Sequence, residues 1–575
     1  MSKQEHLLLF SIGPVQSFIA SARKTEDLWA GSYLLSFLVE KAIQQLHQLS
    51  QVEGGSVELI FPAEHDIAVF PQVASFPNRF LAVVTMSSSQ VPTLCGELAS
   101  FIRYEFEGLC LFGLEDAFAG ATLDDMMRQL TQEQARGVLE INWAVEPLDG
   151  LDYESARRNV ERRLASVKNN RHFSLQDQDG IVCTVCGERE ALRETAHDTR
   201  DSIGKMKYQL RSTWGKLSSK YRDPKASDDP LAEEDVGAGR IRSNETLCGV
   251  CLGKRTTRDY LQAQLSRTIP RFRSTHEVSN PLDYYAILSM DGDNMGRWLA
   301  GKEGDFSEPP GTITFHRLIS ERLARFAGDV VPRRVQEAGG DLVYAGGDDV
   351  LAFLPLPGLL EFMNQIRADF ASLEFGLHPN ATASVGVAVV HKMYPLNLAL
   401  QTARNMEKRA KQYIHPHTGK QKDALGMAVF TRSGEVSEFV VPWTLQGSFS
   451  RQSQTNVTNL MGSLVDLLGD ELSPSFAQHF TEAFSSLLGV DSAGQRKIAI
   501  SSDPVINTRA LTVEMCRLME RSLRDPRSNI RNELPVLSET LLQVHDLMDS
   551  SRAFFGWLKT MQFLARMQKQ EVRVG

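Results

Sequence analysis

The stretch Tyr344-Ala345-Gly346-Gly347-Asp348-Asp349-Val350 decides the fold class of this chain. Short apolar runs flank it, DLVYA at 341–345 and VLAFLP at 350–355, so we predict two strands joined by a tight hairpin. Glycine at both turn positions tolerates positive φ and lets a phosphate approach the backbone closely. Two adjacent carboxylates repel each other, whereas a pair of divalent cations gives a physical reason to place them at one tip.

A strand on the amino-terminal side supplies a third acid. DYYAILSM at 283–290 ends at Asp291, one strand–helix–strand crossover before the hairpin. In a β-α-β-β arrangement these strands are neighbours, so we expect Asp291 to face Asp348. Two Mg²⁺ or Mn²⁺ ions about 4 Å apart can clamp an in-line phosphoryl displacement. We therefore interpret Asp291, Asp348 and Asp349 as the metal-binding catalytic residues of a nucleotidyl-transfer enzyme. An exposed polar turn is the alternative for the hairpin alone, and Asp291 at the strand end disfavours it.

Two further features suit the phosphates of a nucleotide. The segment Gly292-Asp293-Asn294-Met295-Gly296 opens a helix or turn whose free N–H groups fit a triphosphate. Lys411 lies near the end of a predicted helix at 396–413, where it would neutralise phosphate charge. A solvated helix face is the alternative for this lysine, because Arg404, Lys408 and Arg409 are close to it in sequence.

The order of elements around the hairpin occurs twice. Apolar periodicity predicts β-α-β-β-α for the first 110 residues and β-α-β-β-α-β, with an appended helix and strand, from 281 to about 433. The predicted early elements are strands at 7–12, 57–63 and 79–86 and helices at about 17–46 and 92–108. The later helices are predicted at about 314–338 and 358–373, and the later strands at 381–390 and 424–430. Both halves therefore predict a ferredoxin-like palm domain, the architecture of nucleotidyl cyclases.

Four of the seven cysteines form two C-x-x-C pairs, Cys183/Cys186 and Cys248/Cys251. Each pair makes a knuckle that points two thiolates at one ion, and two knuckles complete a tetrahedral zinc site. The 61 residues between the pairs (187–247) form a long loop, but closure entropy grows slowly with length. We predict a structural zinc, since four cysteines leave no open position for catalysis. A redox dithiol is the alternative.

Composition divides the chain into domains and limits its location. At 575 residues it is too long for one core. We predict an α+β multidomain protein with a first palm at 1–150, a zinc-binding insert at 151–275 that carries a charged loop at 222–235, and a second palm at 276–433. Amphipathic patterns without clear strands predict an all-helical domain at 434–575. No apolar run approaches the roughly 18 residues of a membrane span, and we expect a cytoplasmic protein that contacts no membrane.

The net charge of −9 disfavours non-specific wrapping of nucleic acid, which needs a broad cationic surface. Contact through a local basic patch or through partner subunits is compatible with this charge. Together with the motifs above, several longer segments resemble the large subunit of type III CRISPR RNA-guided effector complexes, specifically the III-B (Cmr) branch. The segments that carry the resemblance span residues 6 to about 433 and are Gly13–Ile19, Ala22–Thr25, Asp27–Ser32, Phe76–Phe80, both cysteine pairs, Asp291–Gly296, Gly346–Asp349 and Ser384–Val387.

The resemblance implies that the second palm joins ATP molecules 3′ to 5′ into a cyclic oligoadenylate. Asp291, Asp348 and Asp349 would hold magnesium, and Gly346 and Gly347 would let ATP approach. The first palm would hold the acceptor ATP, with contacts near Gly13–Ser17, including Ser17 itself, and at Asn78 and Arg79. The implied partners are a guide CRISPR RNA, a complementary target RNA that switches the palm on, and smaller backbone and stalk subunits.

One departure from the family pattern concerns DNA cleavage. Many relatives begin with an HD nuclease domain, whereas here the palm begins by residue 6. The dipeptides His65-Asp66, His197-Asp198 and His545-Asp546 lack accompanying ligands, so we expect no HD nuclease activity.

Three other interpretations stay open on the sequence alone. A palm with Gly-Gly-Asp-Asp is also typical of diguanylate cyclases, although two different palms and a zinc insert disfavour that reading. ATP could be joined to another acceptor, such as S-adenosylmethionine, because the acceptor pocket is the least legible part of the sequence. A catalytically silent scaffold of an RNA-guided complex is the third alternative, and the intact set of three acids argues against it.

Overall fold

The computed structural model describes residues 3–63, 73–74, 76–150, 152–170, 180–195, 201–222, 241–267, 269, 272–445, 455–473, 476–485 and 508–574. Compactness divides the chain into two units. Unit 1 contains Met1–Glu277, Gly296–Pro332 and Val343–Gly347, and unit 2 contains Val278–Met295, Arg333–Leu342 and Asp348–Gly575. The division into four domains, which the sequence suggested, stays a prediction. The two units are defined by contacts between segments and do not correspond to the four predicted ranges.

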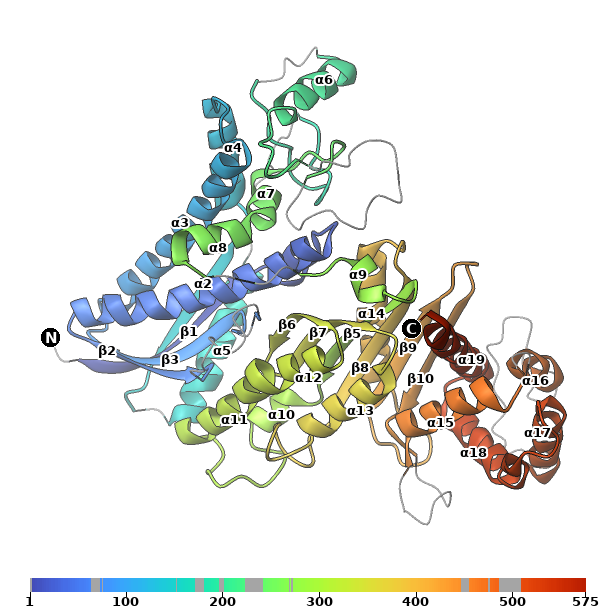
Figure 1. The fold of residues 1–575 in the computed structure, drawn as a ribbon. Coiled ribbons are helices and arrows are strands. Elements are labelled where there is room, and N and C mark those ends of the chain that lie inside the picture. Colours follow the sequence, from blue (N-terminus) through green and yellow to red (C-terminus); the bar gives the residue numbers. More distant parts are fainter. Residues whose placement is uncertain are drawn as a thin grey trace. The chain divides into compact units, whose positions relative to one another are not determined.

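The first palm is a four-stranded antiparallel sheet (Figure 1). Its strands are β1 (Gln4–Gly13), β2 (Ser56–Phe61), β3 (Arg79–Met86) and β4 (Glu140–Pro147), in the order β2-β3-β1-β4. β1 lies at the centre and pairs with β3 and β4, with Phe10 opposite both Phe80 and Trp143. This order is that of a ferredoxin-like sheet, as the element pattern predicted.

Helices cover both faces of this sheet. α2 (Thr25–Val52) and α3 (Val91–Ala117) pack against each other, and α2 also contacts the strands. α5 (Tyr153–Asn169) packs on the face formed by alternate residues such as Leu7, Leu9 and Val83. The other alternate residues of β1, including Leu8 and Phe10, are also fully buried, so the sheet is covered on both sides.

The long helix predicted at 17–46 is wrong in its first turns. The chain instead forms α1 (Gln16–Ala20), leaves the helical conformation, and begins α2 at Thr25. The cause is Asp27, whose Oδ2 accepts the backbone N–H groups of Arg23 and Lys24 at 3.0 and 3.1 Å. These bonds cap α2 and hold a turn where hydrophobic periodicity alone continues the helix.

Three elements between 118 and 170 were not predicted. They are α4 (Asp125–Arg136), β4 and α5, and the last two complete the first palm. The sequence of α5 contains many arginines and glutamates, but its apolar residues Ala156, Val160 and Leu164 recur at helical spacing and are buried. The predicted boundary at 150 therefore lies immediately before a helix that packs on the first palm's sheet.

The cysteine region is built from short helices. They are α6 (Ile203–Trp214), α7 (Gly249–Arg255), α8 (Thr257–Leu265) and α9 (Thr275–Ser279). Both α7 and α8 pack against α3, so the region is joined to the first palm within unit 1. Most of the charged loop predicted at 222–235 lies outside the described residues.

The second sheet has six strands in the order β10-β9-β8-β5-β7-β6. They are β5 (Tyr284–Gly292), β6 (Asp341–Gly346), β7 (Asp349–Pro355), β8 (Ala383–His391), β9 (Ala424–Phe430) and β10 (Val436–Pro442). The first four give the same ferredoxin-like order as the first palm, which confirms the predicted repetition of the element pattern. β9 extends the sheet by pairing parallel with β8, and β10 pairs antiparallel with β9.

The helices that follow β5 agree with the prediction in position. They are α10 (Met295–Leu299), α11 (Ile313–Arg325), α12 (Val331–Glu337), α13 (Leu359–Phe370) and α14 (Leu396–Lys411). The predicted helix at 314–338 contains a π-helical segment at Phe326–Val330 between α11 and α12. α14 lies on one face of the sheet, over β5, β8 and β9.

The carboxyl-terminal part is mostly helical, with one correction. β10 is a seven-residue strand beyond residue 434, where no strand was predicted, and its alternating sequence VSEFVVP is the signal that was missed. Two residue pairs form β11 (Thr444–Leu445) and β12 (Thr455–Asn456). The helices are α15 (Val457–Asp470), α16 (Phe476–Ser485), α17 (Thr508–Ser522), α18 (Leu534–Leu547) and α19 (Ser551–Val574). Within the described residues, none of the helices has the length and apolarity needed to span a membrane.

Candidate active site

The predicted acids meet at one edge of the second sheet. The antiparallel pairing of β5 with β7 ends at Met290 and Val350. Asp291 comes after Met290 in the chain and Asp349 comes before Val350, so both acids lie just beyond this last pair. The N–H of Gly292 donates to the carbonyl of Asp348 at 3.2 Å. A Cβ atom at position 292 would lie 2.8 Å from Cβ of Asp348, so glycine is needed there to admit the hairpin. Asp348 and Asp291 are within hydrogen-bonding reach of each other.

The acids raise one another's pKa. Burial, followed by the charges of Asp291 and Asp349, raises the pKa of Asp348 to about 8. Burial, followed by the charges of Asp291 and Glu407, raises the pKa of Asp349 to about 7. The residue nevertheless has an exposed face, so solvent reaches the Asp349 carboxylate. Such a concentration of negative charge favours binding of a cation.

One face of α14 is directed at these acids. Lys411 forms an ion pair with Asp291, and although burial lowers the pKa of Lys411, this hydrogen bond and charge raise it overall. Glu407 accepts a hydrogen bond from Ser289 Oγ at 2.7 Å. Burial, with a smaller contribution from Asp291, raises its pKa. The positive charge of Arg404 attracts the carboxylates of Asp349 and Glu407 and lowers the pKa of both in part. Lys411 thus lies among the acids rather than on a solvated helix face, and its contact with phosphate stays a prediction.

Glu407 is a site residue that the sequence analysis missed. The signal was its spacing from Arg404 and Lys411, because residues three and four positions apart on a helix share a face. Lys408, one position after Glu407, is exposed.

The predicted phosphate-binding segment has a different role at one residue. Asp293 is only 1% exposed, and its carboxylate accepts hydrogen bonds from Thr382 Oγ1, Ser384 Oγ and the N–H of Asp423 at 2.8 to 3.0 Å. Both oxygens are therefore occupied by protein donors, and the nucleotide contact predicted for Asp293 is wrong. Its carboxylate fixes the turn that follows Asp291.

The other residues of this turn remain accessible. Asn294 is exposed, has a φ of +58°, and accepts a hydrogen bond from Lys422 Nζ at 2.6 Å. Met295 is half-buried and begins α10, which has only five residues. Contact between a nucleotide and Gly292, Asn294 or Met295 stays a prediction.

Glycine occupies the two turn positions of the hairpin, 346 and 347, for different structural reasons. Gly347 has a φ of +87°, which residues with a side chain rarely adopt. A Cβ atom at Gly346 would collide with the hydroxyl of Tyr344, two residues earlier on the same strand. Gly347 is therefore required by the backbone of the turn that precedes Asp348, whereas a side chain at position 346 would require Tyr344 to move.

The acidic group offers the oxygen ligands that magnesium prefers, but its residues do not surround an ion completely. Its donors are carboxylate oxygens, the ligands that Mg²⁺ prefers. Among the described residues, the cysteines form the one group whose metal-binding atoms all lie within 4.8 Å of one another. The acids are more widely spaced and leave room for substrate oxygens, as magnesium sites that use nucleotide phosphates do. Asp291, Asp348 and Asp349 would hold the ions.

The four predicted zinc ligands come together. Their Sγ atoms all lie within 4.8 Å of one another, and those of Cys186 and Cys248 are 3.9 Å apart. A Zn–S bond of about 2.3 Å in a tetrahedral site implies sulfur atoms roughly 3.8 Å apart. The cysteines therefore have the donor set and spacing that zinc requires.

Each cysteine pair has the backbone geometry of a metal knuckle. The N–H of Val185 points at Cys183 Sγ and the N–H of Cys251 at Cys248 Sγ, both at 3.4 Å. Backbone and side-chain hydrogen bonds between Thr184 and Thr246, at 2.9 and 3.0 Å, join the two knuckles. The two pairs, far apart in sequence, thus form one structural group.

One of the two segments predicted to contact an acceptor, Asn78–Arg79, lies beside the last residues of β1, next to the start of the other. The N–H of Ile12 donates to the carbonyl of Asn78 at 2.9 Å, and Asn78 Nδ2 donates to the carbonyl of Ile12 at 3.3 Å. Arg79 pairs with Ser11 across the sheet and lies 3.5 Å from Glu161. Ser17 is exposed on α1 and borders a small cavity shared with Cys251 and Lys254. Their contact with a nucleotide stays a prediction.

One of the three histidine–aspartate dipeptides can be placed. His545 lies in α18, is fully buried, and its Nε2 is hydrogen-bonded to Ser551 Oγ at 2.9 Å. This histidine belongs to the helical core. His65-Asp66 and His197-Asp198 lie outside the described residues.

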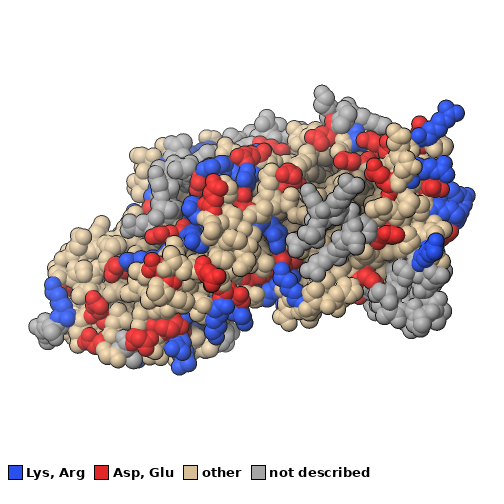
Figure 2. Space-filling model, turned by 90° about the horizontal axis from the view of Figure 1, so that it is seen from below, with Lys and Arg blue, Asp and Glu red and all other residues tan. Residues whose placement is uncertain are grey.

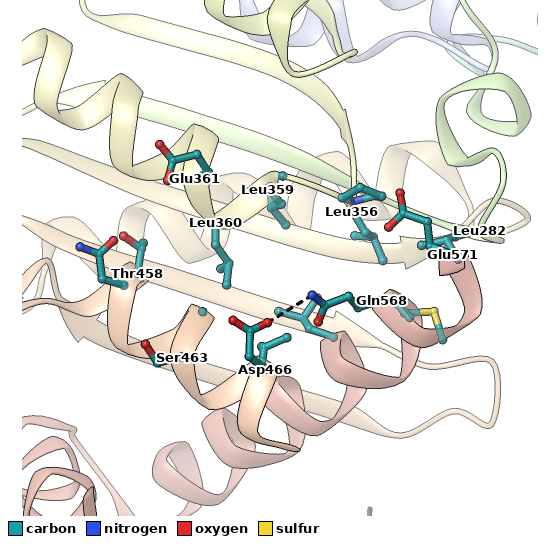
Figure 3. Close-up of a pocket in the computed structure, with 17 residues that line it drawn as sticks. Leu282, Leu356, Leu359, Leu360, Glu361, Thr458, Ser463, Asp466, Gln568 and Glu571 are labelled. Carbon is teal, nitrogen blue, oxygen red and sulfur yellow. Dashed lines mark hydrogen bonds between the residues drawn. The ribbon is translucent and has the colours of Figure 1, made fainter. Parts of the chain in front are cut away.

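A larger cavity lies elsewhere in unit 2. It has a volume of about 550 Å³ and is lined by the start of α13, by α15 and by α19 (Figure 3). Leucine side chains line it, and Glu361, Asp466 and Glu571 surround them. None of the predicted site residues lines this cavity, so it is separate from the acidic group.

Comparison with known proteins agrees with this geometry. The family model "Cas10/Cmr2, second palm domain" matches residues 284–425, and "CRISPR-associated protein Cmr2, N-terminal" matches residues 7–110. The CRISPR system Cmr subunit Cmr2 of Pyrococcus furiosus is 26% identical over 563 residues. That alignment covers 77% of this chain and 63% of the relative, so the chain spans less than two thirds of its length.

Solved structures show the same fold. The apo state of a type III-B Cmr-beta complex contains a chain that is 13% identical, with a TM-score of 0.66, and the match covers 98% of this chain and 82% of that one. The same complex bound to cognate target RNA gives a TM-score of 0.60, again with 13% identity and 98% of this chain covered, and with 83% of that chain covered. The two palm sheets, the acidic hairpin and these matches lead to one conclusion: residues 7–110 and 284–425 correspond to the N-terminal and second palm domains described for Cas10/Cmr2 proteins, and over most of its length the chain is similar to a Cmr2 subunit.

Proposed function

We propose that the second palm joins ATP molecules through 3′–5′ phosphodiester bonds into a cyclic oligoadenylate, within an RNA-guided complex that target RNA activates. The observation that carries this proposal is the group formed by Asp291, Asp348 and Asp349, opposed by Lys411 on α14. These three carboxylates, with Glu407 beside them and a lysine opposite, suit a phosphoryl-transfer site that binds divalent metal in a second-palm fold.

Each residue of the site has a proposed part in this reaction. Bound magnesium would supply Lewis acidity at the reacting phosphate. The glycine turn before Asp348 gives the α-phosphate close access to the backbone, and Lys411 neutralises phosphate charge. The acceptor 3′-hydroxyl loses its proton to water, its oxygen forms a bond to the α-phosphorus, and the bond from that phosphorus to the leaving pyrophosphate breaks. Glu407 and Asp293 fix the surroundings through Ser289, Thr382 and Ser384.

The first palm is proposed to bind the acceptor ATP. It has the same strand order as the second, but residues 62–78 replace the two-glycine turn between its paired strands. Its Gly13–Ser17 and Asn78–Arg79 segments meet at the end of β1. Two sheets of one fold, of which one carries the acids, suit a donor and an acceptor nucleotide.

Guide RNA, target RNA and the backbone and stalk subunits are the proposed partners. A matching solved complex is described as bound to cognate target RNA, which supports this part of the proposal. On the face seen in Figure 2, lysine and arginine are interspersed with acids instead of forming one broad patch. Together with the net charge of −9, this favours RNA contact through limited patches and through partner subunits.

The cysteine group is proposed to hold a structural zinc. All four ligand positions are cysteines and three of the four residues are buried, so the site would contribute folding energy and leave no position open for catalysis.

The test is to incubate the assembled complex with magnesium, labelled ATP and matching target RNA, with and without S-adenosylmethionine, and to identify products by mass spectrometry. Cyclic oligoadenylates from ATP alone are expected. A product that needs S-adenosylmethionine would reassign the acceptor, and no product in either reaction would contradict nucleotidyl transfer.

A double substitution assigns the chemistry to the hairpin. Asp348→Ala with Asp349→Ala should reduce product by at least about 1,000-fold, because the metal ligands are lost, while complex assembly and RNA binding are retained. Product synthesis at the wild-type rate by a properly assembled double variant would overturn the assignment of these acids.

A further inference from the structure

Strand β6, which leads into the catalytic turn, lies at the edge of the second sheet. An edge strand is paired on one side, and alternate residues direct their backbone N–H and C=O groups away from the sheet. Val343 and Ala345 are such residues, two positions apart. The carbonyl of Val343 accepts a hydrogen bond from Ser32 Oγ at 2.6 Å, and the N–H of Ala345 donates to the carbonyl of Ala74 at 3.3 Å.

Both contacts lie inside unit 1, which contains the first palm together with Val343–Gly347. Ser32 is on α2 and is 1% exposed, and Val343 is fully buried. A buried carbonyl without a donor carries a desolvation cost, so this bond is costly to lose. The outer edge of β6 is therefore satisfied by first-palm residues in place of water.

The position of Ser32 is itself strongly restrained. One turn earlier on α2, Asp27 forms a two-pronged ion pair with Arg255 at 2.5 and 2.9 Å, and both side chains are almost fully buried. Next to Ser32, Gly31 leaves space for Lys254, whose Nζ would lie 3.0 Å from a Cβ at that position. Lys254 and Arg255 end α7, the helix whose start is capped by Cys248.

We propose that Ser32 is a positioning residue for nucleotidyl transfer, because it holds the edge of β6 and thereby sets the Gly346-Gly347 turn that carries Asp348 and Asp349. The inference rests on the proposed function and deepens it. It gives Ser32, at the end of the Asp27–Ser32 segment, the role of holding Val343 within unit 1, in the strand that leads into the catalytic turn.

The chain offers a closely matched control. Ser36 lies one turn further along α2, is 5% exposed, and its Oγ accepts the backbone N–H of Phe76 at 2.8 Å. Ser32→Ala and Ser36→Ala each remove one buried hydroxyl and one hydrogen bond to the backbone. They differ in that the Ser32 hydroxyl bonds directly to β6, whereas the Ser36 hydroxyl bonds to Phe76, two residues after Ala74.

The first measurement is ATP turnover by the assembled, target-RNA-bound complex. Ser32→Ala should lower kcat about tenfold with little change in KM for ATP, while Ser36→Ala stays within about twofold of wild type. The two variants should have similar melting temperatures. Equal kcat values for the two variants, or a loss explained entirely by a lower melting temperature of Ser32→Ala, would overturn the positioning role.

The second measurement does not depend on activity. Amide hydrogen exchange of the full chain should be faster over residues 343–350 in Ser32→Ala than in Ser36→Ala, with equal protection in β1 and β3. Unchanged protection of the hairpin in Ser32→Ala would contradict the inference even if the complex is active. Absence of nucleotide product from the wild-type complex would instead refute the proposed function, and the exchange result would still decide whether Ser32 holds β6.

Discussion

At the scale of single residues, the acids of the hairpin are in a strained electrostatic environment without metal. Burial and the neighbouring carboxylates raise the pKa of Asp348 from its ordinary value of 3.8 to about 8. The folded protein thus binds this proton more tightly than the unfolded chain does. Stability from this group is fully present below about pH 4 and is lost as the pH rises through about 8. Lys411 offsets part of the negative charge through Asp291.

Asp348→Asn should therefore stabilise the protein in magnesium-free buffer at pH 8.5. We expect a gain of roughly 1–2 kcal/mol in the free energy of unfolding once solvent screening is discounted. The gain should shrink steadily as the pH falls towards 4, because wild-type Asp348 then becomes protonated. Melting curves by differential scanning fluorimetry across this pH range measure the effect.

Magnesium and an unrelated acid provide the controls for this pH effect. Adding magnesium at pH 8.5 should raise the melting temperature of wild type more than that of Asp348→Asn, since binding stabilises the folded state. Glu97→Gln, an amide substitution at an exposed position on α3, should be nearly neutral at every pH. An Asp348→Asn variant less stable than wild type at pH 8.5 without magnesium would contradict the proposed repulsion.

At the scale of elements, the approach of α14 to the sheet brings Glu407 and Lys411 to the acids. Gly386 on β8 makes this approach possible, because a Cβ atom there would lie 2.1 Å from both the carbonyl oxygen of Ala403 and the N–H nitrogen of Glu407. These are backbone atoms and cannot rotate away. Glycine is therefore required at position 386, within the Ser384–Val387 segment, because α14 packs directly against the backbone there.

Gly386→Ala should displace α14 and lower activity by more than it lowers substrate binding. We expect a loss of about 2–4 kcal/mol in stability, as for overpacking of a closely packed core. Nucleotide product should fall at least about tenfold at a temperature where the variant is still folded. Gly96→Ala, at a helical position with open space around it, should leave both unchanged or slightly improve stability. Wild-type product synthesis by Gly386→Ala would show that the position of α14 does not matter.

The elements also show what could be predicted from the sequence and why. The hairpin, the ferredoxin-like element pattern of both sheets and the cysteine group were predictable because local pattern and tertiary structure agree there, whereas β4 and β10 were missed. The break between α1 and α2 was missed because Asp27 acts through backbone bonds that periodicity does not report. The role of Asp293 was mistaken because its donors, Thr382 and Ser384, are about 90 residues away. A single sequence does not reveal which distant strand will supply hydrogen bonds.

At the scale of the whole molecule, the cysteine group holds together segments that are far apart in the chain. Cys248 caps the start of α7, and Arg255 at the end of that helix binds Asp27 at the start of α2. Arg255 also lies 3.3 Å from Glu245, so a buried network of charges depends on how α7 is placed. Removing one partner of such a buried network is more costly than removing a surface ion pair. Loss of the metal should therefore affect the first palm as well as the cysteine region.

Cys248→Ser should lower the zinc content from one ion per chain and reduce stability well beyond the about 1 kcal/mol of an ordinary substitution. Elemental analysis would measure the metal, and limited proteolysis would show whether cleavage extends from the cysteine region to residues 21–32. Cys516→Ser, at a half-buried cysteine outside the group, should keep both zinc and stability. A Cys248→Ser protein that lacks zinc yet melts like wild type would remove the structural role of the metal. If it were destabilised while residues 21–32 stayed protected, α2 would be held by Arg255 and Lys254 independently of the cysteines.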